Sequence, residues 1–356
     1  MIFIAGITIA VFIEFLLISK REKSEGDIIL ALWIFAITVH LFMFQLYVAD
    51  ELFSYSFLLG IEMPLPLLHG VFLYWYAGTM TDQLPANRKL IALHFLPALA
   101  AYVYLISFFI LPAEQKVEVY KHAGAGYETF MAVRLVAIVL SGFFYIGWSA
   151  VLLARHERRI LSEFSYQDKI DLQWLRILTW GLGVIWLLIF VSDRVLFAGV
   201  VVFVFLIGFF GIRQARIFTH HAVAAGEPEK EKYSKSGLTK ELSDKLYESL
   251  IGLMTKDALY RKNDLSIDDL ADKLDIHPNY LSQVINEREK INFYDFVNRY
   301  RVGEFKKLAS DPKNRHLTLL ALAFECGFNS KSSFNRYFKK ATGQTPSEYF
   351  SALPKP

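Results

Sequence analysis

Seven long apolar runs in the first 213 residues constrain this chain more than any other feature. They cover residues 2–18, 28–49, 57–79, 91–112, 129–153, 174–192 and 195–213, with short polar breaks between them. A helix of about 20 apolar residues crosses the hydrocarbon core of a bilayer and leaves no backbone group unpaired there. The runs raise the hydrophobic share of the 356 residues to 54%, against about 45–50% in an ordinary soluble domain. We therefore expect an all-α chain whose residues 1–218 form a bundle of seven transmembrane helices.

The basic residues between these runs predict the orientation of the bundle. No basic residue precedes the first run, which favours a retained anchor with its N-terminus outside over a cleaved signal peptide. Eleven basic residues follow the first, third, fifth and seventh runs: Lys20, Arg21, Lys23, Arg88, Lys89, Arg155, Arg158, Arg159, Lys169, Arg213 and Arg216. The opposite loops hold three, which are Lys116, Lys121 and Arg194. Because basic loops stay in the cytoplasm, the C-terminal tail is predicted to be cytoplasmic.

The composition changes near Phe218. Residues 219–236 mix charged residues with Gly, Pro and Ser, which is typical of a linker, and residues 237–356 form a second domain. His220 and His221 are adjacent, but they lack the spacing and the cysteine partners of a metal site. The single cysteine, Cys326, excludes an internal disulfide and is consistent with a reducing compartment.

The spacing of apolar residues in the second domain predicts a helix-turn-helix unit. Ser266 followed by Asp269 can cap a helix, and Pro278 suits the first turn of the next helix. The apolar residues recur at steps of three and four: Ile267, Leu270, Ala271 and Leu274 in the first helix, and Tyr280, Leu281, Val284 and Ile285 in the second. About twenty residues suffice for two short helices joined by a tight turn.

The same pattern occurs a second time. Leu322, Ala323 and Phe328 lie 52 residues after Leu270, Ala271 and Ile276, whereas Phe334, Tyr337 and Phe338 lie 53 residues after Leu281, Val284 and Ile285. The second turn therefore has one extra residue, and Gly327 is a natural place for the chain to reverse. Residues 293–310 form an amphipathic helix between the two copies. Such a pair of units can present two recognition helices to successive major grooves of DNA.

These motifs carry a family resemblance. The segments SIDDLADKLDIHPNYLSQVIN, NFYDFVNRYRV and ALAFECGFNSKSSFNRYFKKATGQTPSEY resemble the AraC-type DNA-binding domain, over residues 237–351. The apolar half is similar to seven-span, receptor-like regions that precede this domain in some bacterial regulators, with LPLLHGVFLYWY (65–76) and FFGIRQARIF (209–218) as the weaker signals. The resemblance implies a transcription regulator in the inner membrane of a bacterium, with double-stranded DNA as its partner.

Position on the two recognition helices, together with this resemblance, indicates the side chains that contact DNA. The candidates are Asn279, Ser282 and Gln283 on the first helix, and Lys331, Ser332, Ser333, Asn335, Arg336, Lys339 and Lys340 on the second. Asn and Gln bind adenine edges, and Arg336 is the best candidate for a guanine. Lys339 and Lys340 are expected to meet phosphates, although charge alone would favour a solvated face.

Net charge differs between the two halves of this domain. Residues 237–287 carry six basic and ten acidic residues, and residues 288–356 carry thirteen basic and six acidic ones. We therefore expect the second unit to hold the phosphates more strongly. Cys326 occupies the position of Leu274 in the repeat, so it is expected to be a buried core residue that is not a redox sensor.

Ionisable residues within the apolar runs are a further candidate site. Glu62, His69 and Arg134, with His40 nearby, are hypothesised to bind a ligand in a pocket open to the outside. Pro64 and Pro66 should interrupt the helix there, and irregular backbone is tolerated where it lines a cavity. The alternative is that these side chains hydrogen-bond neighbouring helices, or snorkel to the interface.

Together these features predict a membrane-anchored regulator that couples an unknown small-molecule or membrane signal to transcription. We expect no enzymatic activity, no cofactor and no metal, and we expect tethering to favour pairing of two copies as a homodimer. One alternative is a transporter or intramembrane enzyme with an attached DNA-binding module; neither an inverted repeat nor a nucleophile motif is evident. Another is release of the DNA-binding domain by proteolysis in the linker.

Overall fold

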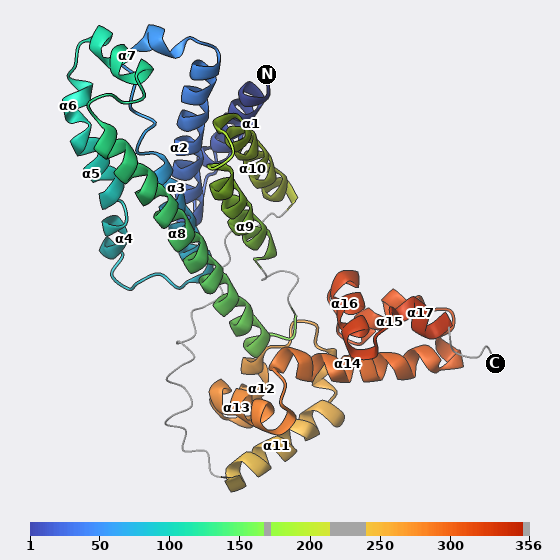
Figure 1. Cartoon of the computed structure of the whole chain (residues 1–356). Coiled ribbons are helices and arrows are strands. Elements are labelled where there is room, and N and C mark those ends of the chain that lie inside the picture. Colours follow the sequence, from blue (N-terminus) through green and yellow to red (C-terminus); the bar gives the residue numbers. More distant parts are fainter. Residues whose placement is uncertain (167–171, 214–239, 352–356) are drawn as a thin grey trace. The chain divides into compact units, whose positions relative to one another are not determined.

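A computed structural model describes residues 1–166, 172–213 and 240–351 (Figure 1). In these ranges the ordered elements are helices, and the one β-type pairing is an isolated antiparallel bridge between Phe164 and Ser266. The predicted all-α class is therefore confirmed for the described residues. The chain divides into two compact units, of which the first contains Met1–Ala154 and Leu172–Ala225 and the second contains Arg155–Asp171 and Gly226–Pro356. The linker predicted at residues 219–236, including His220 and His221, lies outside the described residues.

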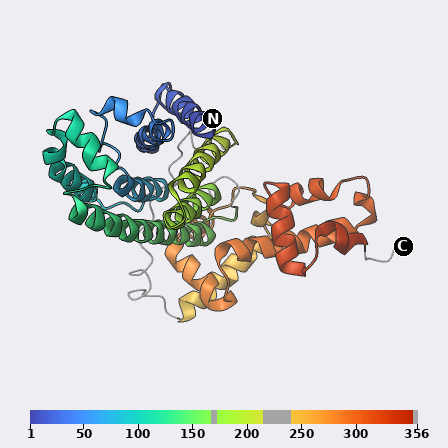
Figure 2. The ribbon, with the colours of Figure 1, turned by 45° about the horizontal axis from the view of Figure 1, so that its top comes forward.

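Helices α1 to α10 supply the first unit. They are α1 (Ile2–Ile18), α2 (Glu25–Val48), α3 (Pro66–Thr81), α4 (Lys89–Leu93), α5 (Leu96–Tyr104), α6 (Ile106–Phe109), α7 (Ala113–Lys121), α8 (Glu128–Glu163), α9 (Gln173–Leu188) and α10 (Asp193–Arg213), with a 3-10 turn η1 (Leu52–Tyr55). In the core, α1 packs against α2 and α10, α2 against α3, and α9 against α10 (Figure 2). Trp33 and Trp174 are fully buried among these helices. Helix α8 is uninterrupted over 36 residues, and its last residues belong to the second unit.

The prediction of seven spanning helices is wrong in number. By length and apolar composition, three helices of the described residues are able to cross a membrane: Glu25–Val48, Glu128–Glu163 and Asp193–Phe210. Shorter apolar helical segments cover Ile2–Ile18, Lys89–Tyr104 and Gln173–Leu188. The prediction used hydrophobicity alone and so treated each run as one helix. The runs do not all have a continuous helical pattern of backbone hydrogen bonds.

Two of the seven predicted spans are broken by their backbone. Residues 56–65 form consecutive turns, and α3 begins only at Pro66, because the prolines at 64 and 66 have no N–H to continue a helix. Gly60 in this stretch has a φ of +92°. The run at 91–112 is divided into α4, α5 and α6, and Pro97 lies in the first turn of α5. The expected irregularity beside Glu62 is thus present, and α3 begins only after it.

Helices α11 to α17 supply the second unit. They are α11 (Lys240–Thr255), α12 (Ile267–Leu274), α13 (Pro278–Glu289), α14 (Phe293–Ser310), α15 (Leu319–Glu325), α16 (Lys331–Thr342) and α17 (Pro346–Ser351), with 3-10 turns η2 (Leu259–Arg261) and η3 (Pro312–Asn314). Helices α12 and α13 form one helix-turn-helix unit, and α15 and α16 form the other (Figure 1). Helix α14 joins them and has the bounds that the sequence predicted.

Local signals explain where these helices begin. Ser266 and Asp269 form the expected capping box at the start of α12, in which each side chain bonds the backbone N–H of the other residue. Pro278 occupies the first turn of α13, as predicted. Helices α12 and α15 begin 52 residues apart, and α13 and α16 begin 53 apart, so the repeat is confirmed with its extra turn residue.

Each helix-turn-helix unit has its own hydrophobic core. The first core contains Leu270, Leu281 and Ile285 together with Phe296 of α14. The second contains Leu322, Phe334 and Phe338 together with Phe305 of α14. Because α14 contributes to both cores, it fixes the two units to one element. Gly327, in the second turn, has a φ of +95°, and a Cβ there would lie 2.5 Å from the carbonyl oxygen of Tyr260.

Candidate nucleic-acid interface

Helix α13 is the predicted recognition helix of the first helix-turn-helix unit. Its inner face buries Leu281, Val284 and Ile285, so its other face carries the polar candidates. Asn279, Ser282 and Gln283 are each half-buried. The Gln283 amide donates a hydrogen bond of 2.8 Å to Glu287, one turn further along. A base edge would therefore have to displace Glu287 from Gln283, a competition that sequence reasoning did not foresee.

Helix α16 is the predicted recognition helix of the second helix-turn-helix unit. Phe334, Tyr337 and Phe338 face its core. Five of its predicted DNA-contacting side chains are exposed, namely Lys331, Ser332, Arg336, Lys339 and Lys340, and Asn335 is half-buried. The helix thus presents a polar surface that carries four cations and opposes an aromatic inner face.

Ser333 differs from the other α16 candidates. Its side chain is 5% exposed, and its hydroxyl has no hydrogen-bond partner among the described residues. Its backbone N–H is bonded to the hydroxyl of Ser330, which caps the helix. Ser333 therefore lies on the inward side of the first turn, next to Phe334. The sequence analysis placed it on the surface because its side chain is polar, although its counterpart in the repeat, Tyr280, is one of the apolar positions of the first recognition helix.

Lys340 is engaged within the protein. Its ammonium lies 2.7 and 2.9 Å from the two carboxylate oxygens of Asp295 in α14. Asp295 is thus a neighbour that the sequence analysis missed, and it partly neutralises the charge that Lys340 was expected to offer to a phosphate. Lys339, one residue before it, is exposed.

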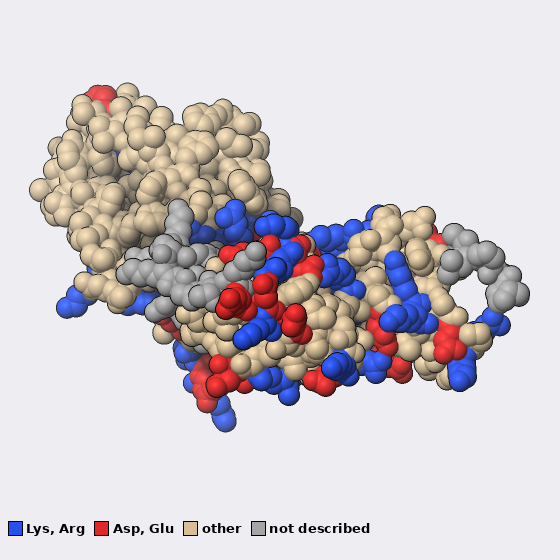
Figure 3. Space-filling model, turned by 90° about the horizontal axis from the view of Figure 1, so that it is seen from below, with Lys and Arg blue, Asp and Glu red and all other residues tan. Residues whose placement is uncertain are grey.

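Charged side chains concentrate on the second unit. In Figure 3 basic and acidic side chains are interspersed over the helices of the second compact unit, whereas the visible face of the first compact unit is almost free of them.

Asp269 illustrates how acidic and basic groups interact in the first helix-turn-helix unit. Burial alone would raise the pKa of its carboxyl group, but hydrogen bonds from Lys262 and Ser266 lower this pKa below its ordinary value. The Asp269 carboxylate is therefore engaged in capping and pairing.

The first unit contains a cavity of about 300 Å³ that brings together three of the four predicted ligand residues. His40, His69 and Arg134 line it, and the two imidazoles approach to 3.3 Å between Nδ1 and Nε2. Arg134 donates a hydrogen bond of 3.1 Å to the carbonyl oxygen of Met63. Asp193, which the sequence analysis did not select, also lines the cavity. The remaining wall is mostly apolar and includes Trp33, Trp186 and Phe197.

Glu62 is not among the residues that line this cavity. The hydroxyl of Tyr120 in α7 donates a hydrogen bond to the carboxylate of Glu62 and accepts one of 3.1 Å from the N–H of Gly60. The turns that precede α3 thus direct Glu62 toward α7. In the part of the chain that the structure describes, no group of three His, Cys, Asp or Glu residues is arranged to bind a metal ion.

Comparison with known proteins gives a family match within the second compact unit. A model of a helix-turn-helix domain family matches residues 270–352. An uncharacterized HTH-type transcriptional regulator of Escherichia coli, YijO, is 34% identical over 85 residues, which cover 24% of this chain and 29% of that protein. A transcriptional regulatory protein of Staphylococcus aureus, HptR, is 27% identical over 85 residues, 24% of this chain and 32% of HptR. An uncharacterized HTH-type transcriptional regulator of Bacillus subtilis, YtdP, is 28% identical over 88 residues, 25% of this chain and 11% of YtdP.

These matches cover less than a third of the length of the relatives. No solved structure matches the chain. The family match and the two observed units agree that residues 270–352 form a helix-turn-helix domain similar to those of transcriptional regulators, which is the coarser part of the AraC-type resemblance.

Proposed function

We propose that this protein is a membrane-anchored transcription regulator that binds double-stranded DNA sequence-specifically through its two helix-turn-helix units. The observation that carries the proposal is the repeat itself. Two units, offset by 52 and 53 residues and joined by α14, each present a polar helix face in the same chain as long apolar helices. A pair of linked recognition helices suits two successive major grooves, about one DNA turn apart.

The exposed cations of α16 support a stronger attraction of DNA phosphates by the second helix-turn-helix unit than by the first. Lys331, Arg336 and Lys339 are solvent-exposed, and each phosphate that such a side chain neutralises releases a counterion. Arg336 remains the best candidate for a guanine, because a guanidinium matches the two acceptors of that base. On α13, Asn279 and Gln283 are the candidates for adenine. Lys340 is a weaker candidate for phosphate contact, because Asp295 holds it.

An apolar stripe along α8 supports the membrane anchor. Val133, Val136, Leu140 and Phe144 follow one another at steps of three and four residues, and each is more than half exposed. A soluble surface rarely leaves so large an apolar patch in contact with water. A lipid environment removes this penalty, since hydrocarbon tails pack against such side chains without any loss of hydrogen bonds.

The proposed orientation is an external N-terminus and a cytoplasmic second unit. Arg155, Arg158 and Arg159 at the end of α8 belong to the same compact unit as the helix-turn-helix domain, and a cluster of arginines favours the cytoplasmic side. A cytoplasmic tail after α10 then requires α9 to cross as well. With 16 residues, α9 is about 24 Å long, so the crossing would need a thin or locally deformed bilayer.

The cavity of the first unit is the proposed signal site. An apolar wall with a few polar groups at one end is the usual composition of a small-molecule pocket. His40, His69 and Arg134 are retained as ligand candidates, and Asp193 joins them. Glu62 is retained only as a residue that acts through Tyr120. We propose a sensing role without catalysis, and pairing of two copies in the membrane would raise the local concentration of their DNA-binding domains.

A direct test uses the full chain in detergent micelles or nanodiscs. Duplexes selected from a random pool should share a motif with two half-sites about one helical turn apart, and binding should weaken steeply as salt rises. Fusions of a cytoplasmic and of a periplasmic reporter to residue 356 should show activity of the cytoplasmic reporter only. Salt-independent binding, absence of a shared motif, or a periplasmic C-terminus would each overturn the proposal.

A further inference from the structure

We infer that residues 161–166, at the end of α8, form a docking segment that seats against α14 and holds the two helix-turn-helix units in one register for DNA. This inference rests on the proposed DNA-binding function. The segment comes from the connection between α8 and α9, far in sequence from the domain that it contacts. Both partners nevertheless belong to the second compact unit.

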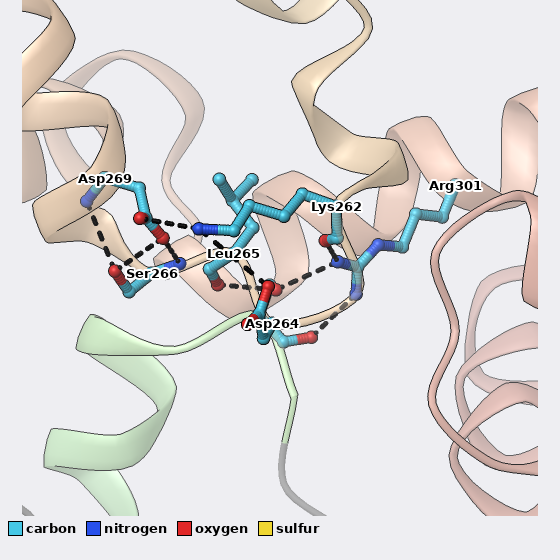
Figure 4. Close-up of polar contacts among 7 residues, drawn as sticks. Lys262, Asp264, Leu265, Ser266, Asp269 and Arg301 are labelled. Atoms are coloured by element: carbon cyan, nitrogen blue, oxygen red, sulfur yellow. Dashed lines mark hydrogen bonds and ion pairs between the residues drawn. The ribbon is translucent and has the colours of Figure 1, made fainter.

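Arg301 of α14 is the centre of the contact between the docking segment and α14, which we call the seat. Its side chain is 1% exposed. Nε donates a hydrogen bond of 2.7 Å to the carbonyl oxygen of Tyr260, and Nη2 donates one of 2.7 Å to that of Lys262. These two bonds hold the backbone around η2, and Figure 4 shows the bond to Lys262. The remaining donors turn to Ser165, where Nη1 lies 3.0 Å from the carbonyl oxygen and Nη2 lies 3.0 Å from the hydroxyl oxygen.

The cation at this seat is satisfied by neutral oxygens. Burial lowers the pKa of Arg301 to about 10, so the guanidinium still carries its charge at neutral pH. A buried charge of this kind is tolerated only when its donors are bonded. Departure of the segment would remove both Ser165 acceptors at once. Docking of the segment therefore contributes to the stability of the helix-turn-helix domain around Arg301.

Ser165 is held by further bonds that do not involve Arg301. Its backbone N–H and its hydroxyl donate hydrogen bonds of 3.1 and 2.7 Å to the carbonyl oxygen of Leu265. Its own carbonyl oxygen accepts a hydrogen bond of 3.1 Å from the Asn298 amide. Phe164 forms an antiparallel bridge with Ser266, the capping residue of α12. The segment thus continues from α8 into a short extended pairing with the first helix-turn-helix unit.

The segment also contacts the second helix-turn-helix unit. Leu161 packs against the core of α15 and α16, whereas Phe164 and Ser165 bind the start of α12. The guanidinium of Arg301 itself lies over the ring of Phe328 in the second helix-turn-helix unit, 5.9 Å from the ring centroid. A single seated segment therefore touches both units and the helix between them, and this arrangement restricts their relative motion.

Register matters for a protein that binds DNA through two linked helices. Both recognition helices gain full contact only when their spacing matches the groove repeat, and ordering them in advance removes an entropic penalty from binding. The seat is also covalently continuous with the signal cavity, because α8 carries Arg134 and remains helical to Glu163. A displacement of α8 is thus able to alter DNA binding without any movement through the linker.

A cysteine pair in the full chain tests the seat without DNA. Residues opposite each other in an antiparallel pair have the separation that a disulfide requires, so Phe164→Cys with Ser266→Cys should cross-link under mild oxidation. Phe164→Cys with Ser332→Cys is the control pair, and it should remain reduced. The native Cys326 is buried and does not interfere. Failure of the first pair to cross-link, with both thiols open to alkylation in the folded protein, would overturn the seat.

Ser165→Pro tests the register, because proline removes the N–H that bonds Leu265. In the full chain we expect binding to weaken about tenfold on a duplex with both half-sites, the scale of one or two lost hydrogen bonds. Binding to a duplex with the second half-site alone should not change. Ser165→Ala, which removes only the hydroxyl, should have a smaller effect in the same direction. Ser162→Ala is the matched control, because its hydroxyl bonds only Arg159 within α8.

The outcomes separate the two proposals. Unchanged affinity of Ser165→Pro on both duplexes, or an equal loss on both, would overturn the register role. If the unmodified chain binds no duplex while the cysteine pair still cross-links, the DNA-binding proposal fails and the seat stands as a contact within the protein.

Discussion

The guanidinium Nη1 of Arg301 lies 3.0 Å from the carbonyl oxygen of Ser165, a residue 136 positions earlier in the chain. Between them in sequence lie α9, α10, α11 and the whole of the first helix-turn-helix unit. A buried cation bonded to a backbone oxygen so distant in sequence ties the end of α8 to the DNA-binding domain.

Arg301→Lys should destabilise the second unit by about 2–4 kcal/mol, because an ammonium cannot reach the acceptors that the guanidinium satisfies and buried acceptors would be left unpaired. Arg299→Lys is the matched control on the same helix. Its side chain is 50% exposed and pairs with Glu289, and an exposed pair contributes less than about 1 kcal/mol. Pulse proteolysis of the second unit at rising urea measures both. An equal shift for the two variants would contradict the role of the buried seat.

Arg336→Ala should weaken binding of the preferred duplex by about 1–3 kcal/mol and relax the preference at one base pair. Lys339→Ala should weaken binding of all duplexes similarly and reduce the slope of affinity against salt by about one. Competition titrations against a set of single-base variants at two salt concentrations distinguish these results. If Arg336→Ala lowers affinity uniformly, Arg336 contacts the DNA backbone instead of a base.

Lys340→Ala should reduce DNA affinity less than Lys339→Ala, since Asp295 already pairs with the ammonium of Lys340. The same titrations measure the difference. Asp295→Asn then provides the complementary test, because it releases Lys340 and should increase affinity at low salt. A larger loss for Lys340→Ala than for Lys339→Ala would show that the ion pair opens in the complex.

Three glycine-to-alanine variants separate backbone strain from steric clash. Gly327→Ala should be the most destabilising, by more than about 2 kcal/mol, because a positive φ is combined with a Cβ only 2.5 Å from the carbonyl oxygen of Tyr260. Gly343→Ala has a φ of +79° and open space, so it should lose about 1 kcal/mol. Gly303→Ala lies within α14 without crowding and should be neutral or stabilising. Urea unfolding of the second unit followed by pulse proteolysis tests this order, and a reversed order would refute it.

Cys326 should resist alkylation in the native protein. Burial raises the pKa of its thiol to about 12, and only the thiolate reacts. Iodoacetamide at pH 8 should therefore label an added surface cysteine, Ser351→Cys, but leave Cys326 unlabelled until the protein unfolds. Because the folded pKa is raised, the related stability is fully present below the unfolded pKa of about 8.5 and declines as the pH rises toward 12. Rapid labelling of the folded chain would contradict this burial.

Much of the second domain was predictable from local sequence. The capping pair Ser266 and Asp269, the proline at 278 and the apolar steps of three and four act within single helices, so their effect does not depend on distant residues. The same holds for the inward position of Cys326, which the repeat predicted and which the structure confirms at 0% exposure. Direct contact of the recognition helices with DNA stays a prediction.

The sequence alone determined that the chain is helical, that an apolar half precedes a tandem helix-turn-helix half, and that α14 joins the two units. These features follow from composition and short-range periodicity. Only the tertiary structure decided which apolar runs are unbroken helices, that Glu62 faces Tyr120 while His40 and His69 meet at the cavity, and that Ser165 binds Arg301. Such outcomes depend on contacts between residues far apart in the chain, and no local pattern encodes which distant backbone oxygen will satisfy a buried donor.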